Sequence, residues 1–256
     1  MDEHGDGKEQ VRVMQEHYDR FLAEHYPWMA GGFEENAEKS RRFFSSQGIV
    51  PHDTRVAIDL GAGCGFHAIP LAGAGFTVHA VDLCQPLLDE LAARADGLPI
   101  TLHTGNILDF APWSGFRPEL IVCMGDTLTH LPDLKSVTDL VRQCHAELGP
   151  GGRCIFAFRD YMPAKDDDVE VIPVRQDEDR IFLCRLEYRK ESLDSTDILY
   201  TRSDGHWSRT SGRYRKIRIG SYGFRKILAD AGFNILYCST GSGILTFIAG
   251  KMPGKS

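Results

Sequence analysis

The chain has 256 residues and a formal net charge of −7 at neutral pH. Hydrophobic residues make up 42% and charged residues 25% of the sequence, which is typical of an ordinary globular protein. The acidic balance argues against a nucleic-acid partner, because proteins that neutralise many phosphates usually carry a basic face. No apolar run is long enough to span a membrane, and the acidic start lacks the features of a signal peptide. We therefore expect a cytoplasmic protein that binds neither nucleic acid nor membrane.

Cysteine and histidine usage predicts no metal site. The seven cysteines are scattered singly, without a C-x-x-C pair, and the ten histidines lack the H-x-x-x-H spacing of metal ligands. Dispersed cysteines in a chain without a signal peptide indicate reduced thiols that pack as small apolar residues.

Two helices are expected before the first strand. Apolar residues recur at helical spacing over about residues 11–26, and Pro27 ends that pattern. A second helical pattern covers about residues 34–47 and stops at Gly48. Residues 1–10 are acidic and polar, and we expect them to be disordered.

From residue 55 onward, apolar runs of strand length alternate with helical stretches. Strands joined by helices form βαβ units, so we expect a parallel sheet covered by helices on both faces. The expected strands are 55–60, 76–81, 100–103, 120–124 and 153–158, and the expected helices are 66–72, 86–95 and 134–148.

After Asp166 the pattern changes to strands joined by short turns, without a helix of useful length between them. Such strands are expected to be antiparallel. The α/β pattern then returns with a helix and two final strands. The expected strands of the insertion are 169–175, 180–189, 198–201 and 214–219, and the final elements are a helix at 221–231 and strands at 233–238 and 244–249.

A glycine-rich turn between the first strand and its helix carries the strongest functional signal. Gly61, Gly63 and Gly65 stand where the backbone passes close to a ligand and any Cβ would clash. Asp82 ends the next strand, where a carboxylate can accept the hydroxyls of a nucleoside ribose. Dinucleotide-binding turns need a further glycine at position 66, where this chain has Phe66. The pattern favours a nucleoside ligand without a pyrophosphate, and a nicotinamide-dependent oxidoreductase is the least favoured alternative.

These residues resemble the motifs of the class I S-adenosylmethionine-dependent methyltransferases. The resemblance implies that the glycine turn holds the methionine part of the cofactor, that Asp82 binds its ribose and that Asn106 and Ile107 contact its adenine. It also implies that the end of the fourth strand faces the sulfonium. The cofactor-binding residues expected on this basis are Asp59, Gly61, Ala62, Gly63, Gly65, Asp82, Leu83, Asn106, Ile107, Met124, Gly125 and Asp126.

Several of these residues also suit a simpler structural role. Asp82 fits the N-cap of the following helix, and Asn106 fits a turn cap. Asp59, inside the first strand, either supports the glycine turn or reaches the cofactor's ammonium through water. Tyr26 and Trp28 are expected to cover the cofactor as part of a lid, or alternatively to anchor the N-terminal helix as core aromatics.

The resemblance also implies a fold. We expect an α/β protein with a doubly wound, mostly parallel seven-stranded sheet of order 3-2-1-4-5-7-6, in which only the last strand is antiparallel. The expected segments are an N-terminal helical lid (1–50), a cofactor-binding core (51–161), an antiparallel β roof over the substrate (162–219) and the completion of the core sheet (220–256).

The sequence after the fourth strand bears on the acceptor. Methyltransferases that modify nucleic-acid bases often have Asn/Asp-Pro-Pro-Tyr/Phe at this place, whereas this chain has Gly-Asp-Thr-Leu-Thr-His. It is more similar to the small-molecule branch, such as the glycine and sarcosine N-methyltransferases. The expected catalytic residues are His130, whose ordinary pKa would suit a base, together with Asp126 and Tyr161. A purely structural histidine is the alternative for His130.

Acceptor binding is expected from Tyr18 in the lid, from Arg159 at the end of the fifth strand and from the basic segment before the last helix. In that segment Arg202, Trp207 and Arg213 are candidates, because a guanidinium binds a carboxylate or phosphate through paired hydrogen bonds. A solvated strand face balanced by nearby acidic residues is the alternative, since only every second strand residue faces a pocket.

We therefore expect a metal-independent enzyme that transfers the methyl group of S-adenosylmethionine to a nitrogen or oxygen of a small-molecule acceptor and releases S-adenosylhomocysteine. An RNA or protein methyltransferase and a non-catalytic S-adenosylmethionine-binding protein are the alternatives. Nothing in the residues excludes a homodimer.

Overall fold

A seven-stranded sheet forms the centre of the protein, which the computed structural model describes over residues 3–109 and 115–252. Its strand order is β10-β11-β5-β4-β1-β2-β3, and β11 alone is antiparallel to its neighbours. This confirms the expected order 3-2-1-4-5-7-6, with β11 and β10 as the seventh and sixth core strands. The strands are β1 (Val56–Leu60), β2 (Thr77–Asp82), β3 (Ile100–Thr104), β4 (Leu120–Cys123), β5 (Arg153–Arg159), β10 (Asn234–Gly241) and β11 (Ile244–Gly250).

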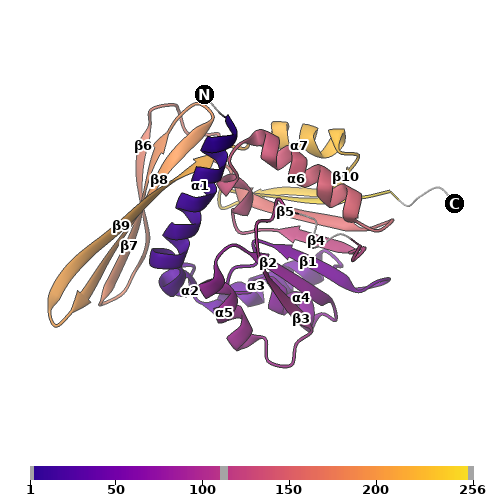
Figure 1. Ribbon diagram of the computed structural model, residues 1–256, viewed down its shortest axis with the longest axis horizontal. Coiled ribbons are helices and arrows are strands. Elements are labelled where there is room, and N and C mark those ends of the chain that lie inside the picture. The colour runs from indigo at the N-terminus through magenta and orange to yellow at the C-terminus, as the bar shows by residue number, and fades with distance from the viewer. Residues whose placement is uncertain (1–2, 110–114, 253–256) are drawn as a thin grey trace.

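Helices cover both faces of this sheet (Figure 1), because successive strand residues point to opposite sides. In β1, the fully buried Ile58 and Leu60 pack in the same apolar cluster as α6 and α7, whereas Ala57 packs with α3, α4 and α5. Burial on both sides explains why every residue of the strand except Asp59 is apolar. The helices are α3 (Phe33–Ser46), α4 (Ala68–Gly73), α5 (Gln85–Arg94), α6 (Leu134–Glu147) and α7 (Ser221–Asp230).

Between β5 and α7 the chain forms a second sheet of four antiparallel strands, in the order β6-β7-β8-β9. The antiparallel insertion is therefore confirmed. Its last two strands are longer than the sequence pattern indicated, because β8 and β9 pair over their whole length. Figure 1 shows this sheet beside the main sheet, with helix α1 between the two. The strands are β6 (Val169–Gln176), β7 (Arg180–Tyr188), β8 (Ser192–Ser203) and β9 (His206–Ile217).

The N-terminal segment is helical from residue 3 onward. Helix α1 (Glu3–His17) continues through a π-helical turn (Tyr18–Leu22) and a 3-10 turn (Ala23–His25) into α2 (Tyr26–Met29). The expectation of disorder was therefore wrong for residues 3–10, while residues 1–2 lie outside the described part of the chain.

Helix α1 is polar, and ion pairs between its own side chains help to stabilise it. Arg12 forms ion pairs with both Glu9 and Glu16, which lie one helical turn away on either side. Pro27, which was expected to end the helical pattern, lies in the first turn of α2, where its missing N–H costs no hydrogen bond. Among the helices of the described ranges, none has the length and apolar character needed to span a bilayer.

Candidate active site

The glycine turn after β1 needs its three glycines for different reasons. All three have positive φ: +80° at Gly61, +52° at Gly63 and +96° at Gly65. A Cβ at Gly61 would lie 2.4 Å from Oγ1 of Thr127, and a Cβ at Gly65 would lie 2.6 Å from Cδ1 of Leu91. A Cβ at Gly63 would meet nothing closer than 3.9 Å. Gly61 and Gly65 therefore permit close packing, whereas Gly63 leaves open the space in front of the turn.

The carboxylate of Asp82, at the end of β2, stabilises this turn by hydrogen bonds. Its carboxylate accepts hydrogen bonds from the N–H groups of Gly63 (2.8 Å) and Cys84 (2.9 Å). Burial raises the pKa of Asp82, although the N–H groups of Cys84, Gly63 and Leu83 act in the opposite direction. The N-cap of α5 is Cys84, so Asp82 does not have the capping role that was its alternative. Each carboxylate oxygen retains a second acceptor position for a ligand hydroxyl.

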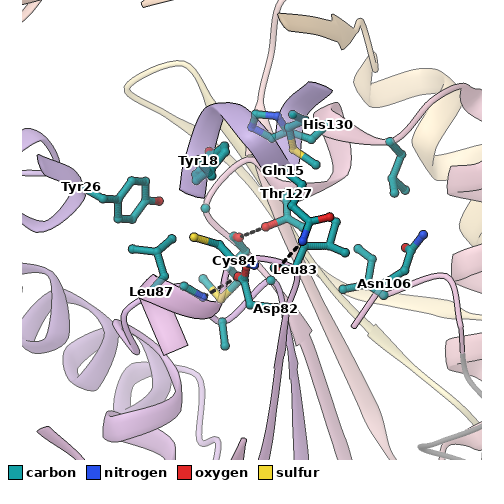
Figure 2. Close-up of a pocket in the computed structure, with 18 of the residues that line it drawn as sticks. Gln15, Tyr18, Tyr26, Asp82, Leu83, Cys84, Leu87, Asn106, Thr127 and His130 are labelled. Atoms are coloured by element: carbon teal, nitrogen blue, oxygen red, sulfur yellow. Dashed lines mark hydrogen bonds between the residues drawn. The ribbon is translucent and has the colours of Figure 1, made fainter. Parts of the chain in front are cut away.

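A first chamber lies in front of the glycine turn and Asp82 (Figure 2). Most of the residues expected to hold a cofactor line it. Tyr26 comes from α2, and the others come from the ends of four separate strands. These residues are Tyr26, Gly61, Ala62, Gly63, Asp82, Leu83, Asn106, Ile107, Met124 and Gly125.

Helix α1 supplies a wall of the first chamber through residues that the sequence analysis did not single out. Val11, Met14 and Gln15 line it, and Nε2 of Gln15 donates a hydrogen bond to the carbonyl of Leu83 at 3.2 Å. Val11 and Gln15 are four residues apart and thus share one helix face. That spacing was the available signal, but it does not say what the face covers.

Four expected cofactor residues do not line the first chamber: Gly65, Asp126, Asp59 and Trp28. Gly65 packs against α5, and Asp126 faces a different cavity. Asp59 is fully buried within β1, where burial and then the charge of Asp82 raise its pKa to about 8. Asn106 does line the chamber and is also a turn cap, because its Oδ1 accepts a hydrogen bond from the N–H of Leu108 at 3.0 Å.

The two aromatic residues expected in the lid have different surroundings. Tyr26 lines the first chamber and stacks on Phe66 at a centroid distance of 5.9 Å. Trp28 lines no chamber; the guanidinium groups of Arg180 and Arg175 lie 4.3 and 5.7 Å from its ring centroid. Trp28 thus contacts the β6–β7 hairpin, which is the anchoring position that was its alternative.

A second, larger chamber lies between the carboxyl edge of the main sheet and the antiparallel sheet. Arg159, Tyr161 and Asp126 line it from the main sheet, and Lys216 and Tyr214 line it from β9. The two chambers share one wall, so ligands in the two cavities would meet there. That shared wall is formed by Tyr18, Tyr26, Phe66, His67, Met124, Gly125 and His130.

Both carboxylate oxygens of Asp126 are occupied. Oδ1 accepts a hydrogen bond from the N–H of Arg159 at 2.9 Å, and Oδ2 accepts from Nζ of Lys216 at 2.7 Å and from the hydroxyl of Tyr161 at 3.0 Å. Burial raises the pKa of Asp126, but the Lys216 charge, His130 and these hydrogen bonds outweigh burial and hold the pKa below its ordinary value. Asp126 is therefore an ionised carboxylate, with hydrogen-bond donors on both oxygens, that positions its neighbours.

His130 lies at the shared wall with a partly buried ring. Its Nδ1 has no hydrogen-bond partner among the described residues, while its ring stacks on Tyr214 at 5.4 Å and meets the edge of Tyr18 at 5.8 Å. Burial, and then the charge of Lys216, lowers its pKa to about 3. The imidazole is thus neutral at physiological pH, rather than titrating near neutrality as its residue type suggested.

The residues expected to bind the acceptor fall into two groups. Tyr18 and Arg159 line the second chamber. Arg202, Trp207 and Arg213 lie on the β8–β9 hairpin and line neither chamber. The two arginines instead contact Asp179 and Asp194 at 3.1 and 2.9 Å, and Trp207 is 46% exposed. This hairpin therefore has the solvated, charge-balanced face that was the alternative interpretation.

Lys216 is the functional candidate that the sequence did not single out. Along β9, Tyr214 and Lys216 are buried, whereas Arg213 and Arg215 are exposed. The alternation of a strand would have grouped Lys216 with Tyr214, but it could not identify Asp126, 90 residues earlier, as its partner.

Comparisons with known proteins agree with this geometry. Residues 57–152 match the family model described as a methyltransferase domain. A methyltransferase of Geobacillus sp. (strain WCH70) is 24% identical over 184 residues, which are 70% of this chain and 74% of that protein. The chain is an S-adenosylmethionine-dependent methyltransferase.

Further similarities concern particular members of this enzyme class. The glycine/sarcosine N-methyltransferase of Aphanothece halophytica is 28% identical over 122 residues, or 44% of this methyltransferase and 43% of that enzyme. The fold resembles an S-adenosylmethionine-dependent methyltransferase from Clostridium acetobutylicum ATCC 824 (TM-score 0.72, 16% identity, covering 94% and 99% of the two chains). It also resembles CalS10, an amino pentose methyltransferase from Micromonospora echinaspora (TM-score 0.70, 19% identity, covering 88% and 94%).

The first chamber of this methyltransferase fits S-adenosylmethionine. The open space at Gly63 admits a ligand against the backbone, and the remaining acceptor positions of Asp82 suit the two ribose hydroxyls. Asn106 and Ile107 line the same cavity from the loop after β3, where an adenine ring would contact them.

Proposed function

We propose that this methyltransferase modifies a nitrogen or oxygen of a small-molecule acceptor, with an amine favoured, in the second chamber. S-adenosylmethionine would be held in the first chamber by the glycine turn, Asp82 and Asn106. The wall shared by the two chambers carries this proposal, because it gives a methyl donor and an acceptor one place to meet.

Methyl transfer mainly requires that the acceptor nucleophile, the methyl carbon and the sulfur lie in line. Bound S-adenosylmethionine supplies a methyl group on a sulfonium, which is a good leaving group. The acceptor's lone pair forms the new bond to carbon as the carbon–sulfur bond breaks, its electron pair stays on sulfur, and the acceptor then releases a proton. The protein's part is to hold the nucleophile in line with the methyl group and to exclude water. The aromatic side chains Tyr18, Tyr26 and Phe66 close the shared wall for that purpose.

His130 would orient the nucleophile. The neutral imidazole can accept a hydrogen bond from the N–H or O–H of an acceptor at its unpartnered Nδ1, in the appropriate tautomer. A pKa of about 3 makes the ring a weak base, so this role is directional and does not store the released proton. Tyr161 and Arg159 would contact more distant polar groups of the acceptor from the other side of the second chamber.

The named relatives support a small amine acceptor. One is described as a glycine/sarcosine N-methyltransferase, and one structural neighbour is described as an amino pentose methyltransferase. Within this proposal, the working parts are the lid (1–50), the cofactor-binding core (51–161), the β roof (162–219) and the completion of the core sheet (220–256).

The test is calorimetric titration of the purified protein with S-adenosylmethionine and S-adenosylhomocysteine, with NAD as the control ligand. We expect both nucleosides to bind and NAD to give no heat. Asp82→Ala should weaken both affinities by at least about tenfold, or 1.4 kcal/mol. Asp230→Ala, which removes an exposed carboxylate on α7, should leave them unchanged. Unaltered affinity in Asp82→Ala would remove the basis of the assignment. Amines would then be screened as acceptors with the wild-type protein.

A further inference from the structure

The second chamber contains a buried ion pair that joins two parts of the fold. Lys216 comes from β9 of the antiparallel sheet, and Asp126 follows β4 of the main sheet. Only 10% of the Lys216 side chain and 14% of the Asp126 side chain are exposed. The solvation free energy lost when two charges are buried can exceed the attraction between them. A contribution to stability is therefore a weak explanation for this pair.

The backbone of Asp126 has an unusual, left-handed conformation that accompanies the ion pair with Lys216. Its φ is +78°, and the preceding Gly125 has a φ of +75°. A left-handed conformation is uncommon for a residue with a side chain and is most often found where the surrounding structure imposes it. Here it accompanies the hydrogen bonds from Arg159, Lys216 and Tyr161 that occupy both carboxylate oxygens.

The position of Asp126 makes its charge relevant to methyl transfer. Its neighbours Gly125 and Thr127 line the first chamber, and Asp126 itself lines the second, so the carboxylate belongs to the loop that separates donor from acceptor. An amine attacks carbon only when its lone pair is free, that is, as the neutral amine. Free aliphatic amines are mostly protonated at neutral pH. An unpaired carboxylate at this position would act as a counter-ion for the unreactive ammonium form.

We propose that Lys216 is a positioning residue for methyl transfer: by neutralising Asp126, it denies the site a counter-ion for ammonium and so commits the second chamber to a neutral amine acceptor. This inference rests on the proposed function, because it concerns the protonation state of the proposed nucleophile.

The other groups around Lys216 do not supply a competing negative charge next to it. Tyr161 after β5 and Tyr214 on β9 contact it as phenols, Tyr18 of the N-terminal segment lies near it, and burial raises the pKa of each tyrosine. His130 is neutral because burial lowers its pKa. The carboxylate of Asp197, on β8, also faces this cavity, but it bonds to His17 of α1 at 2.9 Å. Cys184, on β7, is a thiol whose pKa burial raises to about 11.

Sinefungin provides a test that needs no identified acceptor. This analogue of S-adenosylmethionine carries an amine in place of the sulfonium methyl group, so its ammonium would stand where the methyl group meets the second chamber. S-adenosylhomocysteine lacks any charge at that point. The ratio of the two affinities, measured by calorimetry at pH 7, therefore reports how the site treats a positive charge, while binding of S-adenosylhomocysteine alone reports the integrity of the first chamber.

Three variants give results of different sign. In Lys216→Met, the freed Asp126 carboxylate should favour sinefungin over S-adenosylhomocysteine by about tenfold more than in the wild type. In Asp126→Asn, the uncompensated lysine should shift the ratio by about tenfold in the opposite direction. The double variant has neither charge and should keep the wild-type ratio. Lys226→Met, which removes a lysine paired with Asp230 on the surface of α7, should also leave the ratio unchanged.

The double variant and Asp126→Asn keep the proposal testable if Lys216→Met does not fold, since removing one partner of a buried pair is destabilising. A ratio that stays constant in all the variants, even if both affinities fall together, would show a merely structural role and overturn the inference. If the wild type binds neither S-adenosylmethionine nor S-adenosylhomocysteine, it is the proposed function that fails.

Discussion

The imidazole of His17 fills the space beside Gly212 where any other residue would place its side chain. A Cβ at Gly212 would lie 2.1 Å from Nδ1 of His17. The other ring nitrogen, Nε2, lies 2.9 Å from Oδ2 of Asp197, and the ring packs on Tyr214 at a centroid distance of 4.7 Å. One buried histidine at the end of α1 thus connects this helix to two strands of the antiparallel sheet.

Gly212→Ala should weaken the packing of α1 on the antiparallel sheet. The added methyl group must displace a ring that is 4% exposed, so we expect a loss of about 1–3 kcal/mol in the free energy of unfolding. Since Met14 and Gln15 of the same helix line the first chamber, the affinity for S-adenosylhomocysteine should fall as well. Urea denaturation and calorimetry measure the two effects, and amide hydrogen exchange should increase in α1 first.

A second substitution separates a local clash from a general defect. In His17→Ala/Gly212→Ala the space is free again, so the cost of the alanine at position 212 should largely disappear, measured against His17→Ala alone. If Gly212→Ala is equally costly with and without His17, the glycine is needed for another reason.

The strands, helices and glycine turn were predicted from local spacing, whereas the sheet order was predicted from the family resemblance. The apolar run at β1, the glycine turn and Asp82 lie within 30 residues of one another, and the βαβ rule then places them at one sheet edge. The side-chain pairs between residues far apart in the sequence were not predicted, because local sequence spacing carries no information about them. His17 meets Asp197 across 180 residues, and Lys216 meets Asp126 across 90.

The remaining differences have local physical causes. Residues 3–10 were expected to be disordered from their polarity, yet they form the first part of α1. Glu9 pairs with Arg12, and the next turns of the same helix line the first chamber through Val11, Met14 and Gln15. Arg202 and Arg213 were predicted to bind an anion because the sequence shows the chemistry of their side chains. It does not show which face of the strand each side chain occupies. The pairing of β8 with β9 decides that face, and it places both arginines beside carboxylates outside the chambers.

Gly63→Ala and Gly65→Ala should have opposite profiles. Both positions have positive φ, which costs a side chain about 1–2 kcal/mol. At Gly65 the new methyl group must also displace the fully buried Leu91, so we expect mainly a loss of thermal stability. At Gly63 it enters the first chamber, so the affinity for S-adenosylhomocysteine should fall by at least about tenfold. Thermal unfolding and calorimetry of the two variants make the comparison. Equal losses of stability and affinity in both would contradict the division of roles between these glycines.

Two partly buried histidines, His67 and His130, should make stability depend on pH in a way that single variants can reveal. Burial lowers the pKa of His67 to about 4 and that of His130 to about 3, whereas an unfolded histidine titrates near 6.5. Between these values the unfolded state binds more protons than the folded state, so the stability associated with each neutral histidine is lost as the pH falls from about 6.5 toward the folded pKa. The loss should reach about 2 kcal/mol per histidine between pH 8 and pH 5.

The wild-type curve alone does not show this effect, because Asp59 acts in the opposite direction. Its pKa is raised to about 8, so the stability tied to its protonated form is present at low pH and is lost as the pH rises toward 8. The comparison must therefore be between the wild type and His67→Gln or His130→Gln, each measured by urea denaturation at pH 8 and pH 5. We expect each variant to gain about 2 kcal/mol relative to the wild type on going to pH 5, while Asp59→Asn shifts the opposite way. A variant whose difference from the wild type is the same at both pH values would mean that its histidine titrates normally in the folded protein, and for His130 that would restore the base role that the partly buried, neutral ring argues against.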